Sequence, residues 1–201
     1  MPIKRGWSAK YCDTPLPDSP IKRKPNIVLI DADDHPIVTW RTVSAIAEIT
    51  SHVYEVGKLV RTVVDKSYII LTMQANHVFV LILSVWGRHK FWLTISDCEG
   101  QLCLMVYDLS DFRPINLSLD FLQLIVGFCF TDTQYVSYDP TMITDKYGIV
   151  KLIKCCSKFY DVVCTIYGTQ SFVGRATHVW EWSTSRSTSS SRIPGSRKPT
   201  L

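Results

Sequence analysis

The spacing of apolar residues alternates between two patterns along this chain, and each pattern predicts a different kind of secondary structure. Short apolar runs bounded by turn-forming residues predict buried β-strands. A Gly-led polar turn at 87–90 joins two of these runs as a hairpin, and a third run extends the hairpin into an antiparallel meander. The predicted strands lie at 27–30, 40–50, 78–86, 91–96, 101–107, 147–154, 160–167 and 177–182.

Two segments carry a helical pattern instead. Between Ser51 and Ser67, valines and leucines recur every three to four residues, which predicts an amphipathic helix with Ser51 as its N-cap. A second helix is predicted to begin at Asn116 or Ser118 and to run to Phe130. Because this second segment is apolar on nearly every side, we expect it to be deeply packed.

Together these elements predict an α+β fold, with a mixed or antiparallel sheet and one or two helices packed on it. The two ends of the chain differ from this core in composition. Residues 1–21 are rich in proline and charge, and residues 183–201 are rich in serine and arginine. Such segments bury too little apolar surface to offset the entropy of ordering, so both ends are predicted to be disordered.

Composition narrows the class of protein. The 201 residues are 46% hydrophobic and carry a net charge of +4, as in an ordinary globular protein. The chain opens without a signal-peptide pattern, and its longest apolar run, 78–86, is shorter than the roughly 20 residues that cross a bilayer. Its 7 cysteines form no Cys-x-x-Cys pair, which favours buried free thiols over disulfides or zinc. We expect an intracellular protein, cytoplasmic or nuclear, without membrane contact.

The predicted front strands carry the most suggestive polar residues. Pro25-Asn26 precedes the first strand, and Glu48-Ile49-Thr50 ends the second. This pattern resembles the PD-(D/E)-x-K nucleases, in which two carboxylates hold Mg²⁺ and a lysine steadies the attacking water. Here Asn26 stands in place of the aspartate and Thr50 in place of the lysine. The resemblance predicts a degenerate, nuclease-like remnant of a metal site at Asn26 and Glu48, with an ordinary hairpin as the alternative.

The other polar residues suggest no further site. The five histidines form no ligand-like pair, and the segment 31–36 lacks the glycine and final glutamate of a calcium loop. Basic residues gather at both ends of the chain, which is common in flexible termini. Binding to nucleic acid is therefore disfavoured, although a weak polyanion contact fits the charge.

Four stretches, in order along the chain, resemble the fungal-type protein kinase family. The block from Pro25 to Thr50 is similar to the family's K-P-D … W … E-x-K block, and Gln74–Gly100 is similar to its Q-x-x-R-x-F-V … D-R-x-G region. Leu122–Thr141 is similar to its apolar helix followed by L-G-x-D-P-T. Phe172–Trp180 is close to its L-x-G-R-G-T-x-V-W segment, and these last two matches are the most specific.

The resemblance implies a pre-kinase α+β domain at 22–170 and the first strand of a kinase lobe at 171–182. In this family the Gly-Arg-Gly-Thr stretch looks like the start of the lobe, where glycine lets the backbone approach nucleotide phosphates. The matching residues, Gly174, Arg175 and Thr177, are expected to form a vestigial nucleotide site, because Ala176 replaces the second glycine.

A kinase also needs a lysine for the α- and β-phosphates, an H-R-D-type loop and a D-F-G-type aspartate, and none follows Trp182. We therefore expect a truncated N-terminal fragment that is not an enzyme as it stands and has no cofactor. ATP and Mg²⁺ are expected only where a full kinase lobe is present. The predicted role is regulatory or interaction-type, with an unidentified protein partner. The alternatives are a degenerate nuclease-like domain that binds nucleic acid, and a kinase completed by a partner chain.

Overall fold

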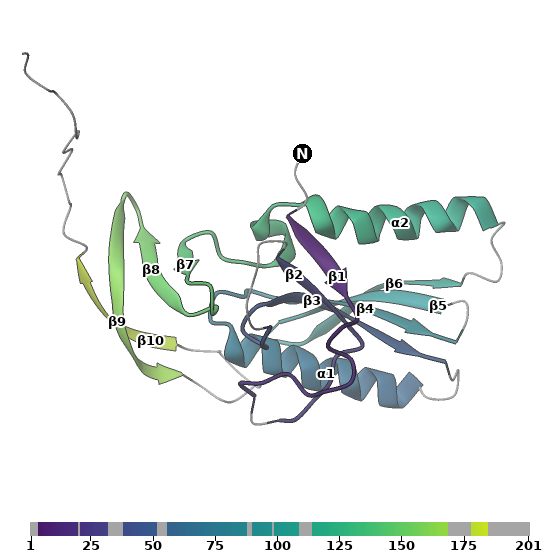
Figure 1. Ribbon diagram of the computed structural model, residues 1–201. Helices are drawn as coiled ribbons and strands as arrows, with labels where there is room; N and C mark the ends of the chain where they lie inside the picture. Colours follow the sequence, from purple (N-terminus) through teal and green to yellow (C-terminus); the bar gives the residue numbers. More distant parts are fainter. Residues whose placement is uncertain are drawn as a thin grey trace, which may run out of the picture.

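A computed structural model describes residues 4–19, 21–31, 38–51, 56–87, 90–97, 99–108, 114–168 and 178–184 (Figure 1). Over these residues the chain forms two β-sheets, two α-helices and one short 3₁₀ helix, η2 (Thr133–Val136). The predicted α+β fold with a mixed sheet is confirmed. No helix among these residues is long and apolar enough to cross a membrane.

The larger sheet has six strands in the order of the chain. Every neighbouring pair is antiparallel except β3 and β4, which are parallel because α1 (Val56–Met73) crosses between them. The predicted meander is present as β4, β5 and β6. The strands are β1 (Arg5–Ser8), β2 (Ile27–Asp31), β3 (Val43–Thr50), β4 (Val80–Trp86), β5 (Lys90–Ser96) and β6 (Gln101–Asp108).

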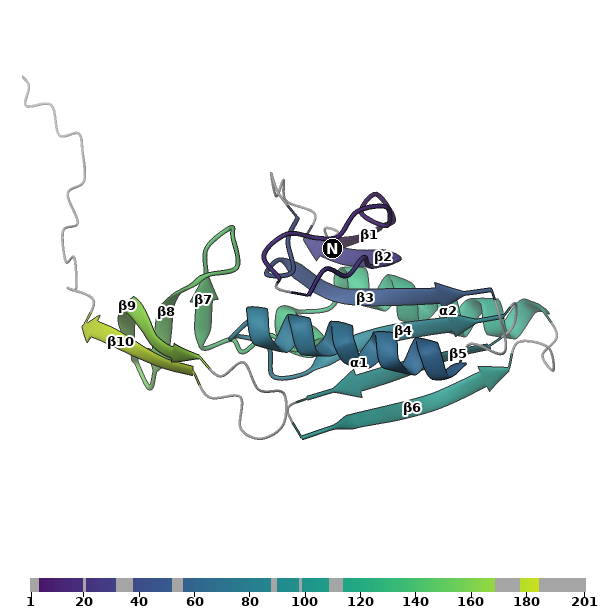
Figure 2. The same cartoon turned by 90° about the horizontal axis from the view of Figure 1, so that it is seen from below.

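The two helices cover opposite faces of this sheet (Figures 1 and 2). Val63 and Ile70 of α1 pack in one buried cluster with Ile46 and Ile82 from the adjacent parallel strands. Val63 belongs to the predicted apolar stripe, whereas Ile70 lies beyond the predicted end of the helix. Burial against the sheet explains why a segment rich in β-branched valines is helical here, because it outweighs the weak intrinsic helix propensity of valine. The helix runs past the predicted end at Ser67 to Met73, and the expected cap at Ser51 adjoins residues outside the described ranges.

On the other face lies α2 (Pro114–Phe130), which differs from its prediction in two respects. It begins at Pro114, so the expected caps at Asn116 and Ser118 are wrong; proline suits the first helical position because it has no N–H to satisfy. The helix is also packed on one side only. Leu122 is 52% exposed and Val126 is 47% exposed. Apolar residues on every side of α2 therefore did not lead to burial of every side of the helix.

Residues 5–8, which were expected in a disordered arm, form β1 and pair with β2. Two side chains of β1 anchor it to α2 and the turn beyond. The Arg5 guanidinium donates to the Thr131 carbonyl oxygen at 3.0 Å, and the Trp7 indole donates to the Ile125 carbonyl oxygen at 3.2 Å. Because these partners lie more than 100 residues away, the local composition of the arm carried no sign of the strand.

The smaller sheet is antiparallel and lies beyond one end of the larger one (Figure 1). Its strands follow the order β10, β9, β8, β7, and the predicted pair and final strand are confirmed as β8, β9 and β10. The three-residue β7 was missed, because so short a run has no readable period. Ser183 and Thr184, expected in the disordered tail, complete β10, and residues 185–201 lie outside the described ranges. The strands are β7 (Met142–Thr144), β8 (Val150–Cys155), β9 (Lys158–Gly168) and β10 (His178–Thr184).

The described cysteines are free thiols, but the prediction that they are mostly buried is wrong. Cys103 is exposed on the larger sheet, and Cys155, Cys156 and Cys164 are exposed on the smaller one. Their apolar neighbours in sequence suggested burial. The β8–β9 ribbon instead leaves both of its faces partly open to solvent.

The tight turn between β7 and β8 packs against the loop before β3 of the larger sheet. Gly148 has a positive φ of 74°, and the Asp145 carboxylate accepts the N–H groups of Tyr147 and Ile149 at 2.9 and 3.0 Å. A Cβ atom on Gly148 would lie 2.2 Å from the carbonyl oxygen of Arg41. Glycine is therefore required here both by the left-handed backbone and by the close approach of the loop before β3.

We expect Gly148→Ala to lower the free energy of unfolding by about 2 kcal/mol or more, since it adds left-handed strain and a backbone clash. Gly127→Ala is the matched control, because its Cβ would meet nothing within 4 Å on the exposed side of α2. That control should raise stability by about 0.5–1 kcal/mol through helix propensity. Urea denaturation measures both changes, and a neutral Gly148→Ala would contradict the close contact with Arg41.

Candidate functional site

The structure brings the two predicted metal-site residues together. Asn26 lies directly before β2 and Glu48 lies near the end of β3, and the Asn26 backbone N–H donates to Glu48 Oε1 at 3.3 Å. Asn26 and Glu48 therefore lie side by side, joined through the backbone of Asn26 and the side chain of Glu48. The predicted nucleotide residues Gly174, Arg175 and Thr177 lie outside the described residues.

Glu48 has a partner that sequence reasoning missed. The Lys66 ammonium group of α1 donates to Glu48 Oε1 in an ion pair that is almost completely enclosed, since each residue is 2% exposed. A charged residue is buried in the middle of a protein only when it is paired. The pair explains how a glutamate can occupy a position of β3 that faces the core.

Burial favours the uncharged form of both Glu48 and Lys66. Loss of water raises the pKa of Glu48 and lowers the pKa of Lys66, because each charged form is poorly solvated in the interior. The opposite charge of the partner works against both shifts. The Asn26 N–H further lowers the pKa of Glu48, and the nearby Arg23 further lowers the pKa of Lys66.

This arrangement does not fit a divalent metal. Magnesium in proteins is held by carboxylates and water, whereas the carboxylate of Glu48 is paired with the ammonium group of Lys66. Asn26 and Thr50 offer neutral side chains only. Among the described residues, no three His, Cys, Asp or Glu side chains converge as a metal-binding group. We therefore derive no metal-dependent step at this position.

A pocket of about 270 Å³ opens beside the ion pair, and we call it the lysine pocket. It lies between the segment before β2, the end of β3 and the first half of α1. Lys58 and Lys66 are eight residues apart on α1, which places them about two turns apart on one side of the helix; that spacing was readable from the sequence. The polar residues lining the pocket are Lys24, Asn26, Glu48, Thr50, Lys58, Thr62 and Lys66.

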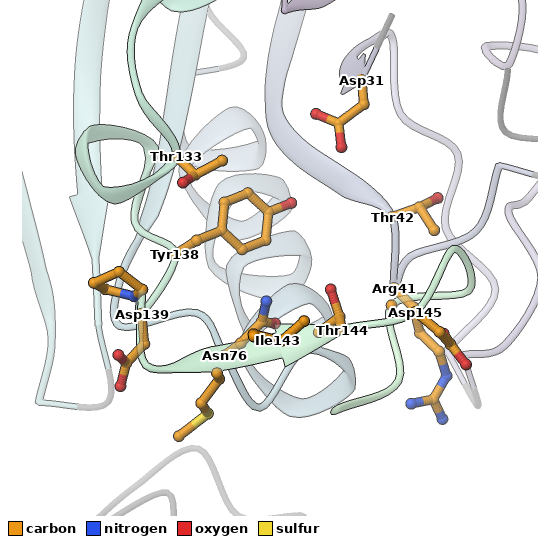
Figure 3. Close-up of a pocket in the computed structure, with 13 residues that line it drawn as sticks. Asp31, Arg41, Thr42, Asn76, Thr133, Tyr138, Asp139, Ile143, Thr144 and Asp145 are labelled. Carbon is orange, nitrogen blue, oxygen red and sulfur yellow. The ribbon is translucent and has the colours of Figure 1, made fainter. Parts of the chain in front are cut away.

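A second pocket, of about 360 Å³, lies between β2, the loop before β3 and the β7–β8 region (Figure 3). Figure 3 shows the ring of Tyr138 crossing its centre. Polar groups around this pocket make hydrogen bonds to other parts of the protein. The Tyr138 hydroxyl is 3.1 Å from Ser44 Oγ, and Asp139 accepts the Thr141 N–H and hydroxyl at 2.8 and 2.7 Å. Burial raises the pKa of Tyr138 to about 12, so this phenol stays protonated.

Behind Tyr138 lies a buried histidine that was not singled out by its sequence context. His77 Nδ1 is 2.7 Å from Ser137 Oγ and 3.1 Å from the Phe79 carbonyl oxygen. The described residues give its Nε2 no hydrogen-bond partner. Ser137 is only 1% exposed, so this serine–histidine contact is closed to a substrate. Burial lowers the pKa of His77 to about 4, and the imidazole is neutral at pH 7.

The ion pair gives a stability prediction. Replacing Lys66 alone with methionine should lower the free energy of unfolding by about 3–5 kcal/mol, because Glu48 is then left buried without a partner. The double variant Glu48→Leu/Lys66→Met should regain most of that loss. Arg23→Met, which breaks the half-exposed Arg23–Asp65 pair, is the control and should cost under about 1 kcal/mol. Equal effects of Lys66→Met and Arg23→Met in chemical denaturation would show that Glu48 is solvated.

His77 gives a prediction of pH dependence. Its pKa is about 4 when folded and 6.5 in the reference state, so between these values the unfolded chain binds a proton that the folded protein excludes. The His77 contribution to the free energy of unfolding should therefore be constant above about pH 6.5. It should fall by roughly 3 kcal/mol in total as the pH drops from 6.5 to about 4. Urea titrations at pH 7 and pH 5 measure how the free energy of unfolding changes with pH, and His77→Gln should make that change smaller. An unchanged slope in His77→Gln would assign the effect to other groups.

Comparison with known proteins identifies the family. The model of the family described as fungal protein kinase matches residues 24–193, which is most of the chain and includes every strand from β2 to β10. No curated protein and no solved structure gives a match. The expectation that the chain is not an enzyme is contradicted, because the matching family is one of protein kinases, which are enzymes. The resemblance stated from the sequence is confirmed: this chain belongs to the fungal protein kinase family.

Proposed function

We propose that this chain takes part in protein phosphorylation, and that its six-stranded sheet with α1 and α2 is a regulatory or interaction module for that reaction. The family match over residues 24–193 carries the proposal. The internal polar groups described above add support. Several buried polar side chains make their hydrogen bonds within the protein, namely His77, Ser137, Tyr138 and Asp139. Because these groups stabilise the fold, they favour a module that supports a binding surface over one that carries out chemistry itself.

The ribbon of β9 and β10 offers such a surface. Val163 and Ile166 of β9 are 59% and 65% exposed, and Trp182 of β10 is 58% exposed. Exposed large apolar side chains on one ribbon commonly mark contacts with another protein surface. The described cysteines are free thiols, which suits the reducing interior of the cell. We therefore place the proposed function in the cytoplasm or the nucleus.

The test measures phosphoryl transfer from labelled ATP to a general protein substrate. Tagged full-length chain is recovered from fungal extract and compared with chain purified alone. We expect the recovered chain to carry transfer activity, and Val163→Glu/Ile166→Glu to lower that activity by about ten-fold, since charges replace the apolar contact. Tyr135→Glu, at another side chain that is 65% exposed, is the matched control and should retain activity.

Each outcome of this assay bears on the proposal. Transfer by the purified chain assigns the chemistry to the chain itself, whereas transfer only after recovery from extract assigns it to a partner complex. Absence of transfer in both preparations would overturn a role in phosphorylation. Full activity of the double variant would overturn the role of the β9–β10 ribbon.

A second candidate is nucleic-acid binding at the nuclease-like position. It is favoured by the three lysines that line the pocket beside Asn26 and Glu48. Phosphate contacts along a nucleic acid release counterions, so such binding would weaken steeply as salt rises. Titration of a fluorescent oligonucleotide at two salt concentrations tests this, and salt-insensitive or undetectable binding would exclude it.

A further inference from the structure

We propose that the second pocket, which has a volume of about 360 Å³, binds an extended peptide segment of another protein. The segment carries a basic side chain and adds to the outer edge of β7 as a further strand. We call this space the β7 pocket. It is distinct from the β9–β10 ribbon, because β7 and β10 are the two end strands of the smaller sheet, and it does not rest on phosphoryl transfer.

The β7 pocket lies along the edge of a strand. All three residues of β7 line it in succession, namely Met142, Ile143 and Thr144. Successive side chains of a strand point to opposite faces of the sheet, so a pocket that is lined by three residues in a row follows the edge of the strand. Among the described residues no further strand pairs with this edge, because β7 ends the order β10, β9, β8, β7.

The backbone groups of β7 alternate between β8 and this outer edge. The Thr141 carbonyl oxygen accepts a hydrogen bond from β8 at 2.7 Å, and the Asp145 N–H donates to the segment before β8 at 2.9 Å. Met142 and Thr144 therefore direct their backbone groups to the outer edge. The Met142 N–H donates to the Asp139 carbonyl oxygen at 3.1 Å. This leaves the Met142 C=O and the Thr144 N–H to pair with an added strand.

A buried amide supports a ligand at the same place. Asn76 is 4% exposed and lines the β7 pocket, and in Figure 3 it lies with Ile143 and Thr144 below the ring of Tyr138. Its side-chain amide makes no hydrogen bond with any described residue, and a buried amide without partners costs free energy. An asparagine side chain has both donors and an acceptor. It therefore matches the C=O and N–H groups of a peptide backbone.

One negative charge in the β7 pocket is left without a counterion. Three of the four charged residues that line it already have partners, and these ion pairs are Arg5–Asp31, Asp18–Arg41 and Asp145–Lys151, at 3.3, 4.0 and 3.6 Å. The fourth, Asp139, forms no ion pair with a described residue. Its Oδ1 accepts the Thr141 N–H and hydroxyl. A lysine or arginine of the added segment would supply the missing positive charge.

The test measures the binding of fluorescent peptides to the full chain by fluorescence anisotropy. The three residues of β7 span about 10 Å, so peptides of about six residues cover the strand. Their sequence alternates valine and threonine, with a central lysine or a central glutamate. We expect the lysine peptide to bind about ten-fold more tightly than the glutamate peptide. N-methylation of its alternate backbone nitrogens should weaken binding by about ten-fold or more, because the donors to the strand edge are lost.

Two substitutions test the side chains of the β7 pocket. Asn76→Leu should weaken binding of the lysine peptide by about ten-fold while leaving the free energy of unfolding unchanged or higher, because it removes an unpaired buried amide and keeps its shape. Asn26→Leu makes the same exchange in the lysine pocket and is the matched control, which should bind normally. Asp139→Asn keeps the oxygen that accepts from Thr141 and should abolish the preference for lysine over glutamate.

The outcomes separate the occupants. Absence of binding by the lysine peptide overturns the proposal. Equal binding of the N-methylated peptide also overturns it, and this comparison uses the unaltered chain, so it does not depend on the folding of a variant. Normal peptide binding by Asn76→Leu has the same consequence. A dimer of the chain that the lysine peptide dissociates, measured by sedimentation, would replace the partner segment with a second copy of this chain. None of these measurements involves phosphoryl transfer, so failure here and failure of the proposed function remain distinguishable.

Discussion

The buried ion pair between Glu48 and Lys66 is the constraint on which the arrangement of this domain depends. It joins the end of β3 to the middle of α1, and these two elements form the crossover that makes β3 and β4 parallel. Neither charge can be separated from the other inside the protein without a large penalty. The pair therefore restricts the rotation and height of α1 on the sheet, together with the buried apolar contacts of the helix.

The same pair determines the chemistry available at the front of the sheet. In the nuclease-like pattern a carboxylate at this position serves a metal ion, together with a second carboxylate. Here the second group is Asn26, and the lysine is supplied by the helix instead of the strand. The charge of Glu48 is therefore neutralised inside the protein by Lys66.

Much of this architecture could be predicted from local sequence, and the failures share one cause. The apolar runs that became β4 to β6, and the stripe that became α1, were readable because burial imposes a period on nearby residues. The strand β1 was not, because its partners in α2 lie more than 100 residues away. Glu48 was recognised as a candidate residue, but Lys66 was not, because a contact across a crossover leaves no mark in the spacing of either segment.

The two ends of α1 connect the pocket to the smaller sheet. The helix is 18 residues long, or about 27 Å, and its first half lines the lysine pocket. After its last turn, the Gln74 side chain donates to the carbonyl oxygens of Trp40 and Val43 at 2.7 and 2.8 Å, and Arg41 donates to the Met73 carbonyl oxygen at 3.2 Å.

Arg41 is also the residue against which Gly148 is packed. An α-helix is stiff over this length, and its far end is hydrogen-bonded to the loop that supports the smaller sheet. Arg41 therefore lies between the last turn of α1 and the Gly148 turn, and contacts both. That contact has no free space, because Gly148 already lacks a side chain. The far end of α1 is therefore connected to the junction of the two sheets through Arg41, which contacts both Met73 and Gly148.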